Sequence, residues 1–330
     1  MLKAALLTCL ALTALAANSV LCRLALGDGA VDAVSFTLIR LGSGIVMLLL
    51  VAFWLLKRQS ASSADQVSTG PAVTDQSAES LASDQSDSRA ITTAGSNSNL
   101  FSLLNSKGSL KAAGMLFLYA IAFSIAYLDL DTGTGALILF GSVQLTMIIV
   151  GLLSGQKLHG IEWAGVIIAF AGFIYLVLPG LTTPSLLGFI LMTLAGIAWG
   201  FYTLMGRGSE NPMLDTAANF LRTWPMLLVL ALWLLWQGAE ISAQGFMLAI
   251  TSGAITSGLG YVIWYAVLKY YSATQAAVLQ LSVPVIAAFG GVLFVAESIS
   301  LNLVLSSLMI LGGILLVIGG RWYLARKVVG

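Results

Sequence analysis

Two arginines lie inside apolar runs of the sequence, where a charge needs a physical reason. Arg40 is part of "SFTLIRLGSGIVMLLL" and Arg222 is part of "NFLRTWPMLLVLALWLLW". A cation at the centre of a bilayer costs at least ~2.5 kcal/mol on insertion scales. Each arginine lies roughly 10 Å from one end of its run, at the helical rise of about 1.5 Å per residue. Three interpretations stay open, namely snorkelling to the head groups, locking or gating of helices, and direct contact with a substrate.

Other polar side chains fall near the middle of apolar runs. Pro284 lies mid-run in "LQLSVPVIAAFGG", where a proline either frees a backbone carbonyl to line a cavity or kinks the helix for packing. Polar and aromatic side chains at similar depth are candidates for contact with a small polar solute. The substrate-binding candidates are Asn18, Gln144, Trp199, Tyr202, Tyr261, Trp264, Tyr265, Gln280, Ser282 and Pro284, and the gating or structural candidates are Arg40, Arg222 and Glu297.

The residue types that enzymes need do not fall in the middle of these runs. An intramembrane enzyme requires a nucleophile beside a base, or a set of metal ligands. The single histidine, His159, lies in a short polar stretch, and the carboxylates Glu162 and Glu297 fall at run ends. A net charge of +1 gives no electrostatic basis for binding nucleic acid. We therefore expect no catalytic residue, no metal and no cofactor, and the sequence identifies no coupling ion.

The composition places these residues in a membrane protein. The 330 residues are 58% hydrophobic and 9% charged, whereas soluble domains carry roughly 25% charged residues. A helix needs about 20 apolar residues to cross the hydrocarbon core. The sequence predicts an all-α fold with ten transmembrane helices, at about 4–22, 34–55, 111–128, 133–153, 161–179, 186–205, 217–236, 247–268, 274–295 and 301–320.

The distribution of lysine and arginine predicts the orientation. With ten spans and the N-terminus inside, every lysine and arginine outside the spans is cytoplasmic except Arg23. Both termini are then cytoplasmic. So is an insert at about 57–110, which is rich in Ser, Ala, Asp and Gln and is expected to be disordered. The first run has the outline of a secretory signal, but it continues through "SVLCRLAL", so we expect a retained helix.

The chain also carries a weak internal repeat. A shift of 182 residues brings Arg40 onto Arg222 and Trp54 onto Trp236, and a shift of 140 residues brings 127–180 onto 267–320 without a gap. We therefore expect one repeat over 1–180 and a second over 181–330, with five spans each. An odd number of spans inverts the second repeat in the membrane, an arrangement found in many secondary transporters.

These residues resemble the EamA-type permeases of the drug/metabolite transporter superfamily. The opening "ANSVLCRLALGDGAVDAVSFTLIRLGSGIVMLLL" is similar to the family opening, with small residues followed by an arginine in the second helix. Pro284, Glu297 and Gly312 match the family's proline, its glutamate at a helix end and its later glycine. The first repeat departs from the pattern, because Gln144 replaces the proline and Gln156-Lys157 replaces Gly-Glu.

The resemblance implies a multi-pass permease of the cell membrane that moves a small metabolite by alternating access. It also implies that spans one, four, six, eight and nine border a central cavity, and that the direction is export. The Gln, Ser, Asn and aromatic hydroxyl groups favour an amino acid or a related solute. Efflux of amphipathic drugs is the alternative, and an intramembrane enzyme is a weaker one. The GxxxG pattern at Gly196 and Gly200 permits either packing within one chain, which we favour, or a homodimer.

Overall fold

The computed structural model describes residues 2–27, 29–68, 102, 104–155, 159–177, 184–206, 209–271 and 279–329. These residues are helical, apart from connecting segments and an isolated bridge between Val31 and Ile241, which confirms the predicted all-α fold. The helices are α1 (Leu2–Gly27), α2 (Ala33–Ser68), α4 (Leu110–Ala126), α5 (Thr132–Leu153), α6 (Gly160–Val177), α7 (Leu186–Gly206), α8 (Pro212–Leu221), α9 (Trp224–Gln237), α10 (Ala243–Ile250), the π-helix η1 (Thr251–Leu259), α11 (Gly260–Val267), the short 3-10 helix η2 (Leu268–Tyr270), α13 (Val283–Val295) and α14 (Leu301–Val329).

Helices occupy all of the predicted apolar runs. Seven stretches are long and apolar enough to cross a membrane, and they include α1, the first part of α2, α5, α7, the α8–α9 pair, the α10–η2 stretch and most of α14. The shorter apolar helices α4, α6 and α13 coincide with the predicted runs at 111–128, 161–179 and 274–295. The structure therefore describes a multi-pass membrane protein.

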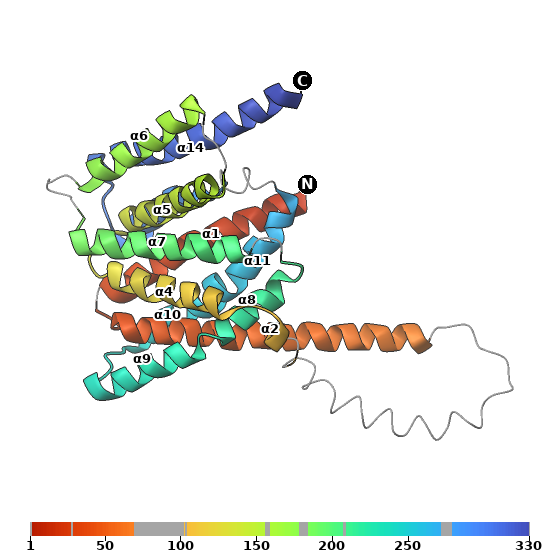
Figure 1. Ribbon diagram of the computed structural model, residues 1–330. Coiled ribbons are helices and arrows are strands. Elements are labelled where there is room, and N and C mark those ends of the chain that lie inside the picture. The colour runs from red at the N-terminus through yellow and green to blue at the C-terminus, as the bar shows by residue number, and fades with distance from the viewer. Residues whose placement is uncertain are drawn as a thin grey trace, which may run out of the picture.

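The helices pack as a bundle with defined neighbours (Figure 1). Helix α7 packs against α4 and α5, α1 packs against α11 and α13, and α2 packs against η1. Helices α6 and α14 pair with each other at one side of the bundle, and α5 also contacts α13. The two chain ends and the far end of α2 lie at the same end of the bundle in Figure 1.

Small residues let two of these helix pairs approach closely. A Cβ atom at Gly253 would collide with the backbone oxygen of Arg40, so this glycine brings η1 against α2. A Cβ atom at Gly196 would lie 2.6 Å from the backbone oxygen of Leu139, and one at Gly200 would lie 3.1 Å from the Thr146 side chain. The GxxxG pattern therefore packs α7 on α5 within the chain, as favoured from the sequence.

Three of the predicted runs are interrupted rather than continuous α-helices. Helix α8 ends before Arg222 and α9 begins at Trp224, with a proline in its first turn. The run at 247–268 contains the π-helix η1, a geometry that is rare and frequent at functional sites. The mid-helix position predicted for Pro284, from which either a freed carbonyl or a kink was expected, is wrong, because Pro284 lies in the first turn of α13, where its missing N–H is not needed.

The insert begins later than predicted. Helix α2 continues through the polar residues 57–68, because Ala, Gln, Lys and Arg favour a helix even where they cannot favour a membrane. Residues 104–109 are also described and lie against α8. The remaining part of the predicted disordered insert, 69–101 and 103, lies outside the described residues.

Candidate functional site

Arg40 is buried in the interior of the bundle, with 1% of its surface exposed. Its Nε donates to Ser257 Oγ at 3.0 Å, and its Nη2 donates to the hydroxyls of Tyr119 at 3.0 Å and Tyr261 at 3.2 Å. The guanidinium carbon also lies 4.8 Å from the ring centroid of Phe123 and 5.3 Å from that of Tyr119. Arg40 therefore does not snorkel, and α2, α4, η1 and α11 meet around its charge.

Asn18 of α1 joins this group through a shared serine. Its Oδ1 accepts hydrogen bonds from the hydroxyls of Ser252 at 3.0 Å, Thr256 at 2.6 Å and Ser257 at 3.0 Å. Ser257 thus accepts from Arg40 and donates to Asn18. We call Asn18, Arg40, Tyr119, Ser257 and Tyr261 the Arg40 cluster, which draws on five elements from α1 to α11.

Aromatic rings extend the cluster toward α7. The Trp199 ring centroid lies 4.8 Å from that of Tyr119, 4.6 Å from that of Tyr261 and 5.3 Å from that of Tyr202. The Tyr265 ring follows Tyr202 at 6.4 Å. Four of the predicted candidates, Trp199, Tyr202, Tyr261 and Tyr265, are therefore one chain of buried ring contacts. Trp264 is also buried, but no described contact joins it to this chain.

Several buried nitrogens in this region have no hydrogen-bond partner within the described chain. All of them are donors, and they are Arg40 Nη1, Asn18 Nδ2, Trp199 Nε1, Trp264 Nε1 and Gln280 Nε2. A buried polar group without a partner loses about 1–3 kcal/mol relative to a satisfied one. The described interior therefore holds five buried N–H donors whose hydrogen-bonding capacity is unused.

The remaining substrate-binding candidates separate from the Arg40 cluster. Gln144 of α5 donates from Nε2 to Gln280 Oε1 at 3.4 Å, and both side chains are buried. Ser282 donates to the backbone oxygen of Leu279 at 2.7 Å, so it stabilises the turn before α13. Pro284 starts α13, as described above. Gln144 and Gln280 thus form a polar contact with each other. Ser282 and Pro284 instead shape the start of α13.

Arg222 lies between α8 and α9 and holds the segment that precedes α4. Its guanidinium donates to the backbone oxygens of Leu104 at 3.2 Å, Asn105 at 2.8 Å and Lys107. Asn219 of α8 accepts from the backbone of Ser109 at 2.9 Å. Arg222 is therefore paired with neutral carbonyls of the segment that leads into α4. We call this the Arg222 contact.

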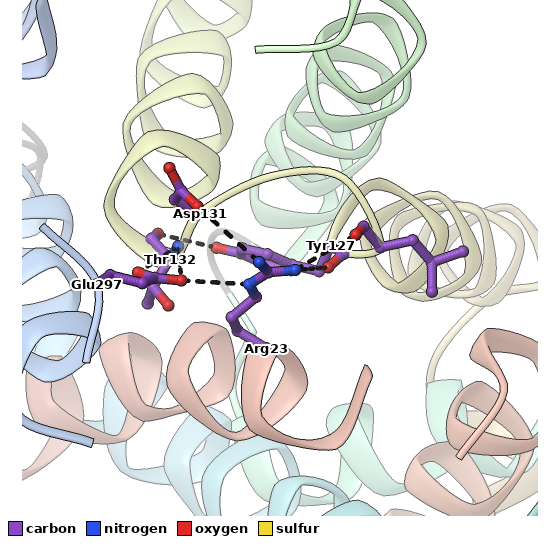
Figure 2. A network of polar contacts seen from close by, with 6 residues as sticks. Arg23, Tyr127, Asp131, Thr132 and Glu297 are labelled. Atoms are coloured by element: carbon purple, nitrogen blue, oxygen red, sulfur yellow. Dashed lines mark hydrogen bonds and ion pairs between the residues drawn. The ribbon is translucent and has the colours of Figure 1, made fainter. Parts of the chain in front are cut away.

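Glu297 follows α13 and takes part in a polar network (Figure 2) with Arg23, which lies near the end of α1 that is away from the N-terminus. Its carboxylate accepts from Arg23 Nε at 3.2 Å and from the backbone nitrogen of Thr132 at 3.1 and 2.9 Å. A left-handed residue, Ala296 with φ 56°, turns the chain so that Glu297 folds back over the helix end. A Cβ atom at Gly291 would meet Glu297 Oε2, so a larger residue there would shift the carboxylate.

Arg23 ties the same network to α4. Its Nη1 donates to the backbone oxygens of Tyr127 at 3.1 Å and Leu128 at 3.3 Å, and its Nη2 lies 3.9 Å from Asp131 Oδ1. The network of Arg23, Tyr127, Asp131, Thr132 and Glu297, the Arg23–Glu297 network, thus joins α1, the α4–α5 connection and the end of α13. Glu297 was a candidate from the sequence, whereas Arg23, predicted just beyond the first span, lies within α1.

Sequence analysis also missed Tyr119 and Ser257, the direct partners of Arg40. The stretch "TSGAITSGL" carries four small hydroxyl residues within an apolar run, and this is the signal that marks η1. Tyr119 offers no such signal, because a lone tyrosine in an apolar helix is common near bilayer interfaces.

A separate pocket of about 610 Å³ lies between α5, α6 and α7. Its walls are mostly apolar, with exposed side chains such as Ile174 and Leu186, and its hydroxyl residues are Ser142, Thr146 and Thr193. None of the predicted substrate-binding residues lines it. We treat it as a groove on the flank of the bundle.

Comparison with known proteins identifies the family. The EamA-like transporter family matches residues 186–319, the part of the chain that holds Pro284, Glu297 and Gly312. An uncharacterized protein of Pseudomonas aeruginosa is 41% identical over 316 residues, which cover 96% of this chain and 94% of the relative. A probable amino-acid metabolite efflux pump of Escherichia coli is 24% identical over 225 residues, 64% of this chain and 75% of that protein.

A solved crystal structure aligns with 96% of this chain and 97% of its own at a TM-score of 0.55 and 16% identity, which shows a shared fold. The family match confirms the resemblance derived from the sequence. The chain belongs to the EamA-like family of membrane transporters.

Proposed function

We propose that this transporter is a permease that exports a small polar metabolite, an amino acid or a related solute, by alternating access. The observation that carries the proposal is the Arg40 cluster with its attached rings, a buried polar and aromatic region where helices from both halves of the chain meet. A membrane protein has no structural need for so many buried donors without partners, because apolar residues would pack there at lower cost.

The helix contacts support two inverted repeats of five spans, over 1–180 and 181–330. In the two repeats α1 corresponds to α7, α2 to α8, α4 to η1 and α11, α5 to α13, and α6 to α14. When each helix is replaced by its counterpart, the α1–α13 pair becomes α7–α5, the α1–α11 pair becomes α7–α4, and the α2–η1 pair becomes α8–α4. Each of these pairs is in contact. The α6–α14 and α5–α13 pairs exchange into themselves. This correspondence is expected of a pseudo-two-fold axis in the membrane plane, around which alternating access proceeds. Ten spans follow if the shorter helices α4, α6 and α13 also cross.

The same arrangement supports the predicted orientation. The chain termini, the far end of α2 and the start of α4, whose preceding segment Arg222 contacts, lie toward one end of the bundle (Figure 1), which we propose is the cytoplasmic end because of the lysine and arginine distribution. The Arg23–Glu297 network then closes the outer end. Glu297 and Arg222 thereby act as gating residues at opposite faces.

The printed names of two relatives support the solute class. The proteins of Escherichia coli and Salmonella typhimurium that share 24% identity with this chain are both described as probable amino-acid metabolite efflux pumps. The aromatic chain from Trp199 to Tyr265 and the polar groups of the Arg40 cluster suit a solute with charged and apolar parts. We propose no enzymatic activity and no bound cofactor.

The second candidate is efflux of amphipathic drugs, which the apolar pocket between α5, α6 and α7 favours. A comparison of metabolites in medium and cytosol separates the two. Cells that overexpress the protein should enrich one or a few polar metabolites in the medium, and null cells should retain them. Cells expressing Arg58→Gln, a change at an exposed residue of α2, should match the wild type. Extrusion of amphipathic dyes without any change in polar metabolites would favour drug efflux and contradict the proposal.

A further inference from the structure

Arg40 carries a buried positive charge that the described chain does not neutralise. Cations inside membrane proteins normally pair with a carboxylate or with backbone carbonyls. The ion pairs among the described residues involve Arg23, Lys107 and His159, and none involves Arg40. Its side-chain hydrogen bonds reach only neutral hydroxyls, and Nη1 has no partner. The fixed charge of the site is therefore +1.

Arg23 and Arg222 show what a satisfied guanidinium looks like in this fold. Arg23 has a carboxylate and two backbone oxygens, and Arg222 has backbone oxygens from the segment before α4. Both are only partly buried. Arg40 is the most deeply buried of the three and has the poorest set of acceptors. Helix packing alone does not account for an arginine at position 40, because a neutral polar residue could hydrogen-bond the same hydroxyls.

Two further buried donors of this region, on Asn18 and Trp199, have no acceptor among the described residues. Asn18 Oδ1 already accepts three hydroxyl hydrogen bonds, and Asn18 Nδ2 remains without a partner. Trp199, whose ring packs at a tilt against the two tyrosines that hold Arg40, also has an N–H without a partner among the described residues. A carboxylate offers two oxygens with about four acceptor positions and one negative charge. A bound carboxylate would accept hydrogen bonds from the unpartnered donors and would also neutralise the charge of Arg40.

We propose that Arg40 anchors a carboxylate of the transported solute through its free Nη1, an inference that rests on the proposed function. Tyr119, Tyr261 and Ser257 fix the other guanidinium nitrogens and so orient the free one. The site then selects solutes that carry a carboxylate and rejects their neutral amides, since a neutral solute would leave the buried cation unpaired.

Binding to purified wild-type protein tests the anchor directly. The probes are the L-amino acids and, for each one that raises the melting temperature, its carboxamide. The carboxamide should bind about 10- to 150-fold more weakly, the loss expected for one hydrogen bond to a charged group. Arg40→Gln should weaken binding of the acid by a similar factor, and Arg58→Gln on the same helix should not. Arg40→Lys should be intermediate, because it retains the charge without the planar fork.

The outcomes divide cleanly. Equal affinity for acid and carboxamide, unchanged affinity in folded Arg40→Gln, or equal stabilisation by chloride alone would each overturn the anchor. If Arg40→Gln does not fold, the acid and amide comparison in the wild type and in Arg40→Lys decides. Transport into vesicles separates the two proposals. Acid-selective binding without transport supports the anchor and overturns the permease, whereas transport indifferent to the carboxylate and to Arg40→Gln supports the permease and overturns the anchor.

Discussion

The Arg23–Glu297 network should control how often the outer end of the bundle opens. Glu297→Gln retains the shape of the side chain and one acceptor oxygen, but it removes the charge that Arg23 Nε meets at 3.2 Å and one of two oxygens near Thr132 N. The two side chains are 20% and 13% exposed, so solvent screens them little. A hydrogen bond to a charged group is worth about 1.5–3 kcal/mol. The ratio of outward-open to closed molecules should therefore rise about 10- to 150-fold.

Asp131 provides a matched control on the same arginine. Its carboxylate is 63% exposed and lies 3.9 Å from Arg23 Nη2. An exposed pair of this kind contributes at most about 1 kcal/mol. Asp131→Asn should therefore change the ratio by about fivefold or less. The difference between the two variants isolates the buried contact from the general loss of a negative charge.

The chain contains a reporter for this experiment. Cys22 is fully buried beside Arg23, whereas Cys9 is exposed and is removed as Cys9→Ser. An impermeant maleimide added outside should label Cys22 faster in Glu297→Gln than in the wild type or in Asp131→Asn. Equal labelling rates in all three folded proteins would show that the network does not close the outer end, and the reasoning would be refuted.

Four further predictions follow from the same contacts. Arg222→Ala removes charged hydrogen bonds to backbone carbonyls, and these are worth about 1.5–3 kcal/mol. It should therefore raise the rate at which a reagent on the cytoplasmic side labels Cys22, whereas Glu297→Gln raises labelling from the outside. Replacing 69–101 with a Gly/Ser linker should leave transport largely unchanged at normal expression, and extending the replacement through Lys107 should reduce it, because Arg222 binds that segment. Gly196→Leu should lower the stability by about 1–3 kcal/mol through overpacking, measured by thermal melting, while Gly312→Leu, which meets open space, should not. Cysteines at Ser86 and Gly330 should resist impermeant reagents in intact cells, and labelling of either from outside would contradict the orientation.

Much of the fold was predictable because a bilayer imposes a simple rule on sequence. Apolar length alone located a helix at each predicted run. Apolar length could not predict the interruptions of the α-helices, because the stretch that forms η1 and the turn before α13 are as apolar as their surroundings. It also ended α2 too early, since the polar residues 57–68 form a helix that apolar length cannot detect.

The site was predictable as a set of residues but not as an arrangement. Most of the polar and aromatic candidates are buried, because polar groups in a lipid environment face the bundle interior. Their partners were not predictable, since Tyr119 and Ser257 lie 79 and 217 positions from Arg40 in the chain. Helical periodicity gives no help here, because the lipid face and the packed face of a membrane helix are both apolar.

The proposed repeat gives these long-range contacts a common origin. If Arg40 and Arg222 are equivalent positions of an inverted repeat, the duplication placed one arginine toward each face of the membrane. Arg222 still holds one end of the bundle through backbone carbonyls. At the other end the corresponding contacts are made by Arg23, one helix before Arg40 in the chain, together with Glu297 after α13. Arg40 is thereby left with a spare donor in the interior, where an unpaired charge lowers stability. Proteins retain such costly groups where function needs them, and a carboxylate carried across the membrane is the function that fits this one.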